Sequence, residues 1–376
     1  TTFKGLPGDC APGDRLLIDD GNVAVRVVEV TDTDVVTRVE VPGMVSDHKG
    51  LNLPGVAVSV PALSAKDKED LRWGIEQDAD FIALSFVRSA EDIKDVHEIM
   101  DEMGKRIPVI AKIEKPQAVE ALEDIIEAFD GIMVARGDLG VEMPLEAVPL
   151  VQKRAIELAR IAAKPVIVAT QVMDSMIKNP RPTRAEASDC ANAILDGADA
   201  VMLSGETSVG AFPIETVRTM AAIIESTEEN GGERIASIPG FFADRAGVIC
   251  EAAARIAEHM DARYLVTFTQ SGTSARMLSR MRRPIPMLAF TPLESTRRRL
   301  ALSWGIQTYR VPEVQHTDDM VWQLDLVAQS SRLAEIGDQL VIVAGMPPGI
   351  PGSSNMLRIH EVGDEADYMI GGAREA

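Results

Sequence analysis

Residues 108–115 read Pro-Val-Ile-Ala-Lys112-Ile-Glu114-Lys. The apolar and partly β-branched run before Glu114 predicts a buried strand. Side chains two positions apart on a strand point to the same face, so Lys112 and Glu114 should project together from its end. A cation beside a carboxylate at the edge of a buried sheet is costly to desolvate and indicates chemistry. Taken alone, the pair is also typical of a surface ion pair at a strand terminus.

The pattern around this strand repeats between residues 65 and 229, where short apolar runs alternate with amphipathic helical patterns. The predicted strands are 81–86, 108–113, 131–135, 165–169 and 200–203, and the predicted helices include 91–103 and 150–163. Alternating strands and helices predict a parallel sheet that is covered on both faces. Thr183 and Glu186 form a capping-box pattern that predicts another helix start, and Gly197 suits the end of that helix.

Different patterns flank this middle block. Residues 14–28 predict two strands joined by a tight turn, and residues 35–41 predict a third strand. A second α/β block begins near residue 240. It contains a predicted helix at 245–260, predicted strands at 263–268, 286–290, 306–311 and 339–343, and a Pro/Gly-rich loop at 345–355. We therefore expect three domains, at residues 1–60, 61–230 and 240–376.

Composition limits the class of protein. The chain has 376 residues, is 46% hydrophobic and carries a formal net charge of −20, which argues against nucleic acid or an anionic membrane as a partner. The charge does not exclude anionic substrates, because a site can be locally positive. The three cysteines form no C-x-x-C pair, which favours a reducing cytoplasm over a disulfide framework or a thiolate metal site. No apolar run is long enough to span a bilayer.

Polar residues follow the predicted strands of the middle block where each strand ends. They are Ser85, Lys112 with Glu114, Arg136 with Gly137 and Asp138, Thr170 with Gln171, and Ser204 with Glu206. In parallel α/β architectures the carboxyl ends of the strands converge on the active site. We therefore expect these residues to form one site.

Glu114 and Asp138 come from adjacent strands and offer hard oxygen ligands, which suit Mg²⁺ or Mn²⁺. Gly137 permits a close backbone approach, and the N–H groups near Gly137 and Asp138 could hold a substrate carboxylate. Lys112 supplies a point charge that can stabilise charge as it moves during a reaction.

Thr170 offers a hydroxyl group without an adjacent base, so we interpret it as a positioning or proton-relay residue rather than a nucleophile. The alternative for Thr170 and Gln171 is helix N-capping. For Arg136 and Glu206 the alternative to a direct role is an internal ion pair.

Several motifs, in this order along the chain, resemble the pyruvate kinase family. They are Ile110-Ala-Lys-Ile-Glu-Lys115, Ile132-Met-Val-Ala-Arg-Gly-Asp-Leu-Gly140, Ala169-Thr-Gln171, Met176-Ile-Lys-Asn-Pro-Arg-Pro-Thr-Arg-Ala-Glu186 and Val201-Met-Leu-Ser-Gly-Glu-Thr207. The resemblance runs through essentially the whole chain. It is closest to bacterial members, with the actinobacteria as a candidate group.

The resemblance implies an α/β fold with a partial TIM-type (β/α)8 barrel, five of whose eight βα units are visible. It also implies a small partial β lid domain and a C-terminal α/β regulatory domain. The family's activity is phosphoryl transfer from phosphoenolpyruvate to ADP in glycolysis, by a cytoplasmic, allosteric homotetramer. The chain begins at Thr1 inside the lid, so we expect an N-terminally truncated piece whose own activity stays open. The potassium ligands are expected in the missing part.

The resemblance also implies roles for individual residues. Glu114 and Asp138 bind the divalent cation, Mg²⁺ or Mn²⁺, and Lys112 stabilises charge on the transferring phosphoryl group. Gly137, Asp138 and Thr170 line the substrate, with Thr170 near the face where the enolate takes its proton. In the lid, Lys49 would reach the nucleotide, ADP or ATP; the alternative is a solvated turn lysine.

The regulatory domain should hold a phosphorylated effector. The segment expected to bind it comprises Thr269, Gln270, Ser271, Gly272, Thr273 and Ser274. Its hydroxyl and backbone N–H groups could cradle a phosphate, and the 345–355 loop could close over it. In members activated by fructose bisphosphate the residue matching Thr273 is commonly arginine, so the resemblance favours AMP or a sugar monophosphate. The alternative is an ordinary capped helix start.

Two other functions stay open at this stage. One is a metal-dependent lyase or aldolase that acts on pyruvate enolate in a similar barrel, and the other is a non-catalytic ligand-binding fragment. Assays of phosphoryl transfer against carbon–carbon cleavage distinguish the first from a kinase, and titration with phosphoenolpyruvate or Mg²⁺ tests the second.

Overall fold

The computed structural model describes most of the chain: residues 1, 3–19, 21–47, 49–56, 63–238, 245–314, 316–350 and 352–364. The expected domain boundaries near residues 60 and 240 fall in segments outside the described residues. Contacts divide the chain into two compact units. The first comprises Thr1–Leu158, Val166–Cys190 and Val201–Met220, and the second comprises Ala159–Pro165, Ala191–Ala200 and Ala221–Ala376.

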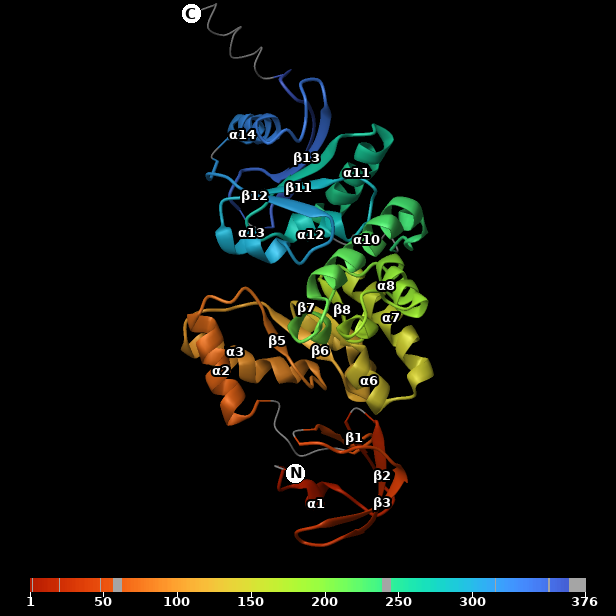
Figure 1. The fold of residues 1–376 in the computed structure, drawn as a ribbon. Helices are drawn as coiled ribbons and strands as arrows, with labels where there is room; N and C mark the ends of the chain where they lie inside the picture. Colours follow the sequence, from red (N-terminus) through yellow and green to blue (C-terminus); the bar gives the residue numbers. More distant parts are fainter. Residues whose placement is uncertain are drawn as a thin grey trace, which may run out of the picture. The chain divides into compact units, whose positions relative to one another are not determined.

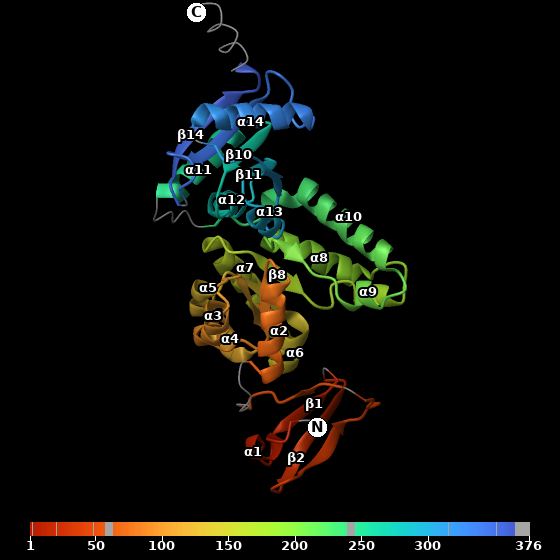
Figure 2. The same cartoon turned by 90° about the vertical axis from the view of Figure 1, so that its left-hand side faces the viewer.

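The N-terminal part of the first unit is a small antiparallel sheet in the order β3-β2-β1-β4 (Figure 1). The strands are β1 (Arg15–Ile18), β2 (Val23–Val30), β3 (Val35–Val41) and β4 (Leu51–Asn52). The predicted hairpin and third strand are thus confirmed. A short helix, α1 (Leu6–Asp9), lies beside this sheet (Figure 2). Its Leu6 packs into the same apolar cluster as Leu16 and Val25.

The described residues of the middle block form a five-stranded sheet in the order β5-β6-β7-β8-β9. The strands are β5 (Ile82–Leu84), β6 (Val109–Ile113), β7 (Gly131–Ala135), β8 (Val166–Ala169) and β9 (Ala200–Val201). The pairs from β5 to β8 are parallel, with Ile113 opposite Val134 and Ala135 opposite Ala169. Every residue of β7 is buried, as expected for a strand covered on both faces. The predicted parallel α/β sheet is therefore confirmed.

Helices connect these strands. They are α2 (Ala65–Glu76), α3 (Ile93–Glu102), α4 (Pro116–Glu120), α5 (Leu122–Ala128), α6 (Arg136–Glu142), α7 (Val148–Ile161), α8 (Arg184–Asp196), α9 (Gly205–Ser208) and α10 (Pro213–Gly231), with short 3-10 turns at Ala90–Asp92, Leu145–Ala147, Asp174–Ile177 and Gly232–Arg234. Helix α8 begins with the predicted capping box, in which Thr183 N donates to Glu186 at 2.7 Å and Glu186 N donates to Thr183 Oγ1 at 3.2 Å. Gly197, with φ +96°, follows its end.

The C-terminal α/β block has a five-stranded sheet in the order β12-β11-β10-β13-β14. The strands are β10 (Tyr264–Phe268), β11 (Met287–Thr291), β12 (Ile306–Arg310), β13 (Gln339–Gly345) and β14 (Ser354–Glu361). Strands β12, β11, β10 and β13 run parallel, and β14 is antiparallel to β13. The four predicted strands are confirmed, whereas β14 was not predicted.

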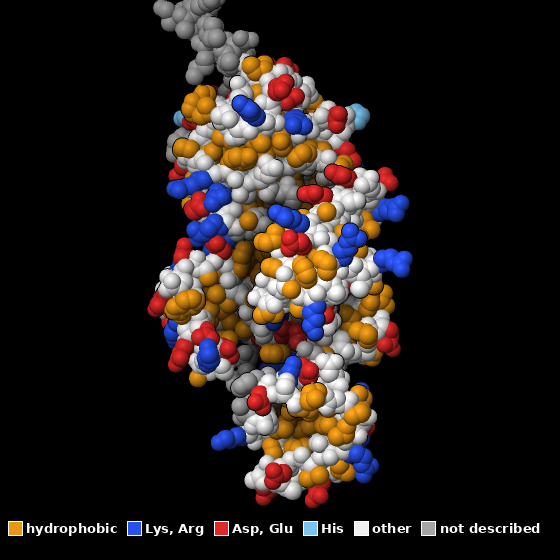
Figure 3. Space-filling view, in the orientation of Figure 1, with side chains coloured by type: hydrophobic (Ala, Val, Ile, Leu, Met, Phe, Trp, Pro, Cys, Tyr) orange, Lys and Arg blue, Asp and Glu red, His pale blue; other side chains and the backbone are white. Residues whose placement is uncertain are grey.

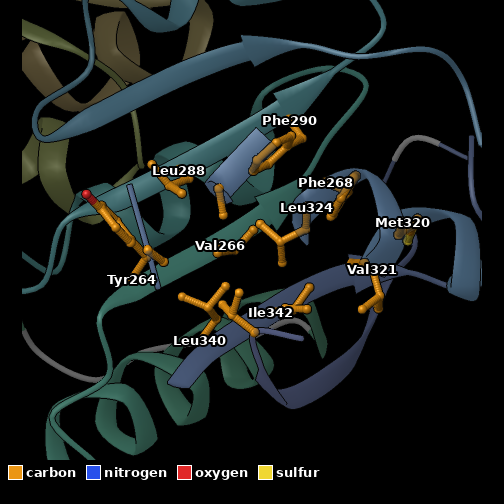
Figure 4. Close-up of a cluster of buried hydrophobic side chains, with 14 of the residues drawn as sticks. Tyr264, Val266, Phe268, Leu288, Phe290, Met320, Val321, Leu324, Leu340 and Ile342 are labelled. Carbon is orange, nitrogen blue, oxygen red and sulfur yellow. The ribbon is translucent and has the colours of Figure 1, made fainter. Parts of the chain in front are cut away.

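Helices cover both faces of this sheet. They are α11 (Arg245–His259), α12 (Thr273–Ser279), α13 (Glu294–Leu300) and α14 (Thr317–Ser330). On one face, Leu324 of α14 packs against Val266 and Ile342 (Figure 4). Helices α11 and α12 lie on the other face (Figure 1). They pack against alternate residues of the same strands, such as Leu265. Aromatic rings extend the first cluster, with Phe268 and Phe290 stacked at 5.1 Å between ring centroids.

Acidic and basic side chains are interspersed on the face shown in Figure 3, so the net charge does not collect in one patch there. Among the described residues, no helix combines the length and the apolarity needed to cross a bilayer.

Candidate functional site

The Lys112–Glu114 pair lies at the carboxyl end of β6. The distance from Lys112 Nζ to Glu114 Oε1 is 2.5 Å, which confirms that the two side chains share a face. The side chains are 25% and 2% exposed, so Glu114 is not part of a surface ion pair. Two contacts from the end of β5 fix the pair: Phe86 N donates to Glu114 Oε2 at 2.6 Å, and Lys112 donates to Ser85 Oγ at 3.0 Å. A buried, oriented carboxylate beside a cation is the arrangement expected at a reacting centre.

The neighbouring strand β7 leads directly into α6, which carries Gly137 and Asp138 in its first turn. Gly137 N donates to Thr170 Oγ1 at 2.7 Å. A Cβ atom at Gly137 would lie 3.2 Å from this oxygen, closer than most such contacts, so the expected close approach is present. In this structure the Gly137 N–H is therefore used by Thr170.

Glu114 and Asp138 follow the adjacent strands β6 and β7, and both offer carboxylate oxygens. Among the described residues, no group of three or more His, Cys, Asp and Glu side chains could hold a metal ion. A pair of carboxylates nevertheless fits Mg²⁺ or Mn²⁺, because these ions are commonly held by one or two carboxylates together with water and substrate oxygens. The burial and fixed orientation of Glu114 support this donor set.

Thr170 follows β8 in an unusual backbone conformation. Its φ is +69°, and that of Gln171 is +53°, in the left-handed region that β-branched residues rarely adopt. Thr170 Oγ1 donates to Ala169 O at 2.6 Å. The next helical turn is Asp174–Ile177, whose N-cap is Met173, so Thr170 and Gln171 do not cap the turn that follows them. The Thr170 hydroxyl instead accepts an N–H group from the first turn of α6.

For Arg136 the sequence left two alternatives, a direct role in the site or an internal ion pair, and the structure shows an ion pair with Asp189. Its Nη1 lies 2.6 Å from both carboxylate oxygens of Asp189, and its Nη2 donates to Thr170 O at 3.0 Å. Glu206 behaves differently, since this buried carboxylate accepts hydrogen bonds from Met173 N at 3.1 Å and Ser204 N at 2.8 Å. Asp189 was not predicted as a site residue, because no local pattern in the sequence links it to Arg136.

Lys49 lies in the N-terminal part of the first unit, just before β4. Its ammonium group is 2.7 Å from Asp19 Oδ1, and its side chain is 40% exposed. Hydrogen bonds from Lys49 and then Asn22 hold the pKa of Asp19 below its usual value. Lys49 is thus an ion-paired lysine in an irregular segment, and its contact with a nucleotide remains a prediction.

The C-terminal block contains a cavity of about 120 Å³ at the carboxyl ends of β10 and β13. The predicted segment lines it through Thr269, Gln270, Ser271, Thr273 and Ser274, and the Pro/Gly-rich loop lines it through Gly345, Gly349, Ile350, Gly352, Ser353 and Ser354. The two segments therefore face one another, as expected. Strand β10 lies between β11 and β13, and such a reversal of strand order is where open α/β sheets bind ligands.

Hydroxyl groups order the predicted segment. Gly272, with φ +82°, donates its N–H to Thr269 Oγ1 at 2.9 Å. Ser271 Oγ and Thr273 Oγ1 are 2.9 Å apart. Gly272 is the N-cap of α12 and has no side chain, but Thr269 Oγ1 and Ser271 Oγ accept the N–H groups of Gly272 and Thr273, so the alternative of a capped helix start stays open. Among the described residues that line the cavity, Glu313 carries the single charged side chain.

Comparison with known proteins gives one consistent result. The family model described as "Pyruvate kinase, barrel domain" matches residues 1–217, and the model described as "Pyruvate kinase, alpha/beta domain" matches residues 247–360. A pyruvate kinase of Corynebacterium efficiens is 55% identical over 365 residues, which cover 97% of this chain and 77% of that protein. A pyruvate kinase of Mycobacterium tuberculosis strain H37Rv is 55% identical over 367 residues, with the same coverage. One of Clostridium perfringens is 43% identical over 370 residues, which cover 96% of this chain and 77% of that protein.

Proposed function

The chain belongs to the pyruvate kinase family, and on that premise we propose roles for its residues in phosphoryl transfer from phosphoenolpyruvate to ADP. The products of this glycolytic reaction are pyruvate and ATP. The lyase, aldolase and non-catalytic alternatives do not account for a family match that extends over both parts of the chain. The observation that carries the assignment is the buried Lys112–Glu114 pair at the end of β6, beside the strand that leads to Asp138.

Glu114 and Asp138 would hold the divalent cation, Mg²⁺ or Mn²⁺. When bound, that ion supplies a Lewis acid for the phosphoryl and enolate oxygens. Lys112 adds a preorganised charge where negative charge develops, which suits a transfer reaction that needs positioning and neutralisation more than covalent help. Its contact with Ser85 Oγ, 3.0 Å long, limits where the ammonium group can move.

Gly137, Asp138 and Thr170 would line phosphoenolpyruvate, with the Thr170 hydroxyl at the face where the enolate takes its proton. The short contact between Gly137 N and Thr170 Oγ1 supports a shared surface for these residues. Lys49 would contact the nucleotide once its ion pair with Asp19 is broken. The family also implies K⁺ as a second cofactor, for which we assign no residue in this chain. A cytoplasmic homotetramer, and domains at residues 1–60, 61–230 and 240–376, belong to the same proposal.

A direct assay tests the function. The full-length protein, incubated with phosphoenolpyruvate, ADP, Mg²⁺ and K⁺, should release pyruvate and ATP in equal amounts, and chelation of the divalent ion should stop the reaction. Cleavage of a pyruvate aldol adduct in the same buffer, without phosphoryl transfer, would identify a lyase instead.

We further propose that the cavity between β10 and β13 binds a phosphomonoester that activates the enzyme, either AMP or a sugar phosphate. Thr269, Gln270, Ser271, Gly272, Thr273 and Ser274 would hold the phosphate. Glu313, the charged residue in the lining, would disfavour a second phosphate and could accept hydrogen bonds from sugar hydroxyls. Thr273 offers no guanidinium fork, so a bisphosphate should bind less well than a monophosphate.

The effector site can be tested with a Ser271→Asp variant, which places a negative charge in the cradle. Activation by AMP or sugar phosphates should be lost while unstimulated turnover persists. Ser331→Asp adds the same charge after the end of α14, outside the cavity lining, and serves as the control. Undiminished activation of the Ser271→Asp variant would place the effector site elsewhere.

A further inference from the structure

The left-handed backbone of Thr170 and Gln171 needs support from its surroundings. Non-glycine residues persist in this conformation only where other parts of the structure hold them, and such strain concentrates at functional sites. Two groups of hydrogen bonds hold this backbone conformation. One group is made to Thr170 itself, and the other is made to Met173 and Ser175, which follow it in the loop.

Contacts to the following residues come from two carboxylates. Glu206 accepts the N–H of Met173 at 3.1 Å. Glu186 accepts the N–H of Ser175 at 2.7 Å and its hydroxyl at 2.5 Å. These contacts fix the course of the loop, but neither reaches the Thr170 hydroxyl.

Arg136 and Gly137 act on Thr170 directly and at both of its polar ends. Arg136 Nη2 donates to the Thr170 carbonyl at 3.0 Å, and Gly137 N donates to the Thr170 hydroxyl at 2.7 Å. Because Arg136 and Gly137 are consecutive, one short segment at the start of α6 holds both the carbonyl and the hydroxyl of Thr170. The Thr170 hydroxyl therefore accepts one hydrogen bond from Gly137 N and donates its own proton to Ala169 O at 2.6 Å.

Asp189 fixes the guanidinium group in turn. Both oxygens of Asp189 lie 2.6 Å from Arg136 Nη1. The Arg136 side chain is 13% exposed and the Asp189 side chain is 36% exposed. A planar guanidinium held at one amino group by a carboxylate and at the other by a carbonyl has little freedom to rotate. The chain of contacts therefore runs from α8, through Arg136, to Thr170.

We propose that Arg136, anchored by Asp189, is a positioning residue that sets the orientation of the Thr170 hydroxyl for the protonation of the enolate. This inference rests on the proposed function, which places Thr170 at that face of the substrate. Arg136 and Asp189 act through Thr170 and need no contact with phosphoenolpyruvate. A lysine at position 136 would keep the charge but would lose the planar fork that contacts Asp189 and the Thr170 carbonyl.

The test compares Arg136→Lys, Asp189→Asn and Thr170→Ala in the full-length protein. We expect Arg136→Lys and Asp189→Asn to lower kcat about tenfold to a hundredfold, as a small misplacement of a reacting group does, with little change in the KM for phosphoenolpyruvate. Exchange of the pyruvate methyl protons with solvent should fall in parallel. The decisive measurement is the double variant: Arg136→Lys combined with Thr170→Ala should be no slower than Thr170→Ala alone.

Controls separate positioning from stability. Arg154→Lys alters an exposed ion pair between Arg154 of α7 and Glu123 of α5 and should leave kcat unchanged. Urea unfolding midpoints show whether a loss of kcat reflects a loss of fold; if Arg136→Lys fails to fold, the isosteric Asp189→Asn variant makes the same comparison with Thr170→Ala. Multiplicative losses in the double variant, or a normal kcat in both single variants, overturn the inference. A wild-type protein without phosphoryl transfer would contradict the proposed function as well, whereas an active wild type with multiplicative losses contradicts this inference alone.

Discussion

At the scale of single residues, Glu114 and Glu142 provide a matched pair of buried carboxylates. Glu114 pairs with Lys112 at 2.5 Å, and Glu142 pairs with Lys115 at 2.6 Å; the carboxylate side chains are 2% and 3% exposed. Glu114 is a proposed ligand of the divalent cation, whereas Glu142 is not. Because the two have similar burial and similar partners, a comparison between them isolates the metal from the ion pair.

The first prediction uses this pair. Glu114→Gln keeps an oxygen for the Phe86 N–H but removes the charge that a divalent ion needs, so metal-dependent turnover should fall on the order of a hundredfold or more. Glu142→Gln should change turnover far less. Metal titration of turnover and thermal unfolding would be measured for both variants. Normal metal affinity and turnover in Glu114→Gln would remove Glu114 from the metal site.

The second prediction concerns the two lysines. Lys112→Met removes one preorganised charge from a shielded site, which typically costs on the order of a hundred- to a thousandfold in rate. The affinity for phosphoenolpyruvate should change much less, and proton exchange of pyruvate, which involves no phosphoryl transfer, should be less affected. Lys115→Met is the control, because its lysine also faces a buried carboxylate. Similar losses in both variants would show that Lys112 acts only through general electrostatics.

At the scale of elements, the strands that carry the site could be predicted because their signals are local. Apolar runs predicted β5 to β9 and β10 to β13, and the polar residues directly after them make up the candidate site. Strand β14 was missed because Ser354–Glu361 contains polar residues throughout and becomes a strand by pairing with β13. The two-residue β4 and the single-turn α1, which contains a proline and a glycine, have too little local pattern to predict.

The candidate site could be predicted only where its residues directly follow a strand. The contacts that orient these residues come from segments far away in the sequence and could not be predicted. Asp189 lies 53 positions from Arg136, and no local pattern links them. Glu313 also follows a strand, β12, so the rule that found Lys112 could have found it.

The third prediction concerns the start of α8. Burial acts to raise the pKa of Glu186, but hydrogen bonds from Ser175 and Thr183 outweigh it and hold the pKa below the usual value of 4.5. A carboxyl group with a lowered folded-state pKa stabilises the fold above its unfolded pKa, and this contribution is lost as the pH falls through the folded pKa. Glu186→Gln should therefore lower stability by about 1–2 kcal/mol at neutral pH and less in acid.

Urea unfolding at neutral and acidic pH measures this difference. The matched control is Glu123→Gln, which alters an exposed pair with Arg154 and should stay within about 0.5 kcal/mol of wild type. A Glu186→Gln penalty that is equal at neutral and acidic pH would contradict the ionised cap.

At the scale of the whole molecule, contacts between distant segments hold the second unit together. Arg282 donates to Gly197 O at 2.7 Å and pairs with Asp199 at 3.0 Å, although these residues lie more than 80 positions away. Asp199 also accepts the N–H of Trp304 at 3.0 Å, and the Arg282 guanidinium lies 5.0 Å from the centre of the Trp304 ring. One buried carboxylate thus joins three segments of the chain.

The last prediction follows from the burial of this pair, whose side chains are 2% and 8% exposed. Asp199→Ala would leave the Arg282 cation in a poorly solvated place without its carboxylate, a change that typically costs about 3–5 kcal/mol. Glu258→Ala breaks the more exposed pair with Arg283, at 34% and 44% exposure, and should cost at most about 1 kcal/mol. Trp304 lies beside the buried pair, so its fluorescence during urea unfolding can report on the region directly. If the two variants unfold at similar urea concentrations, the Asp199–Arg282 pair does not join the segments of this unit, and other contacts, such as the hydrogen bond from the Arg282 side chain to Gly197 O, must do so.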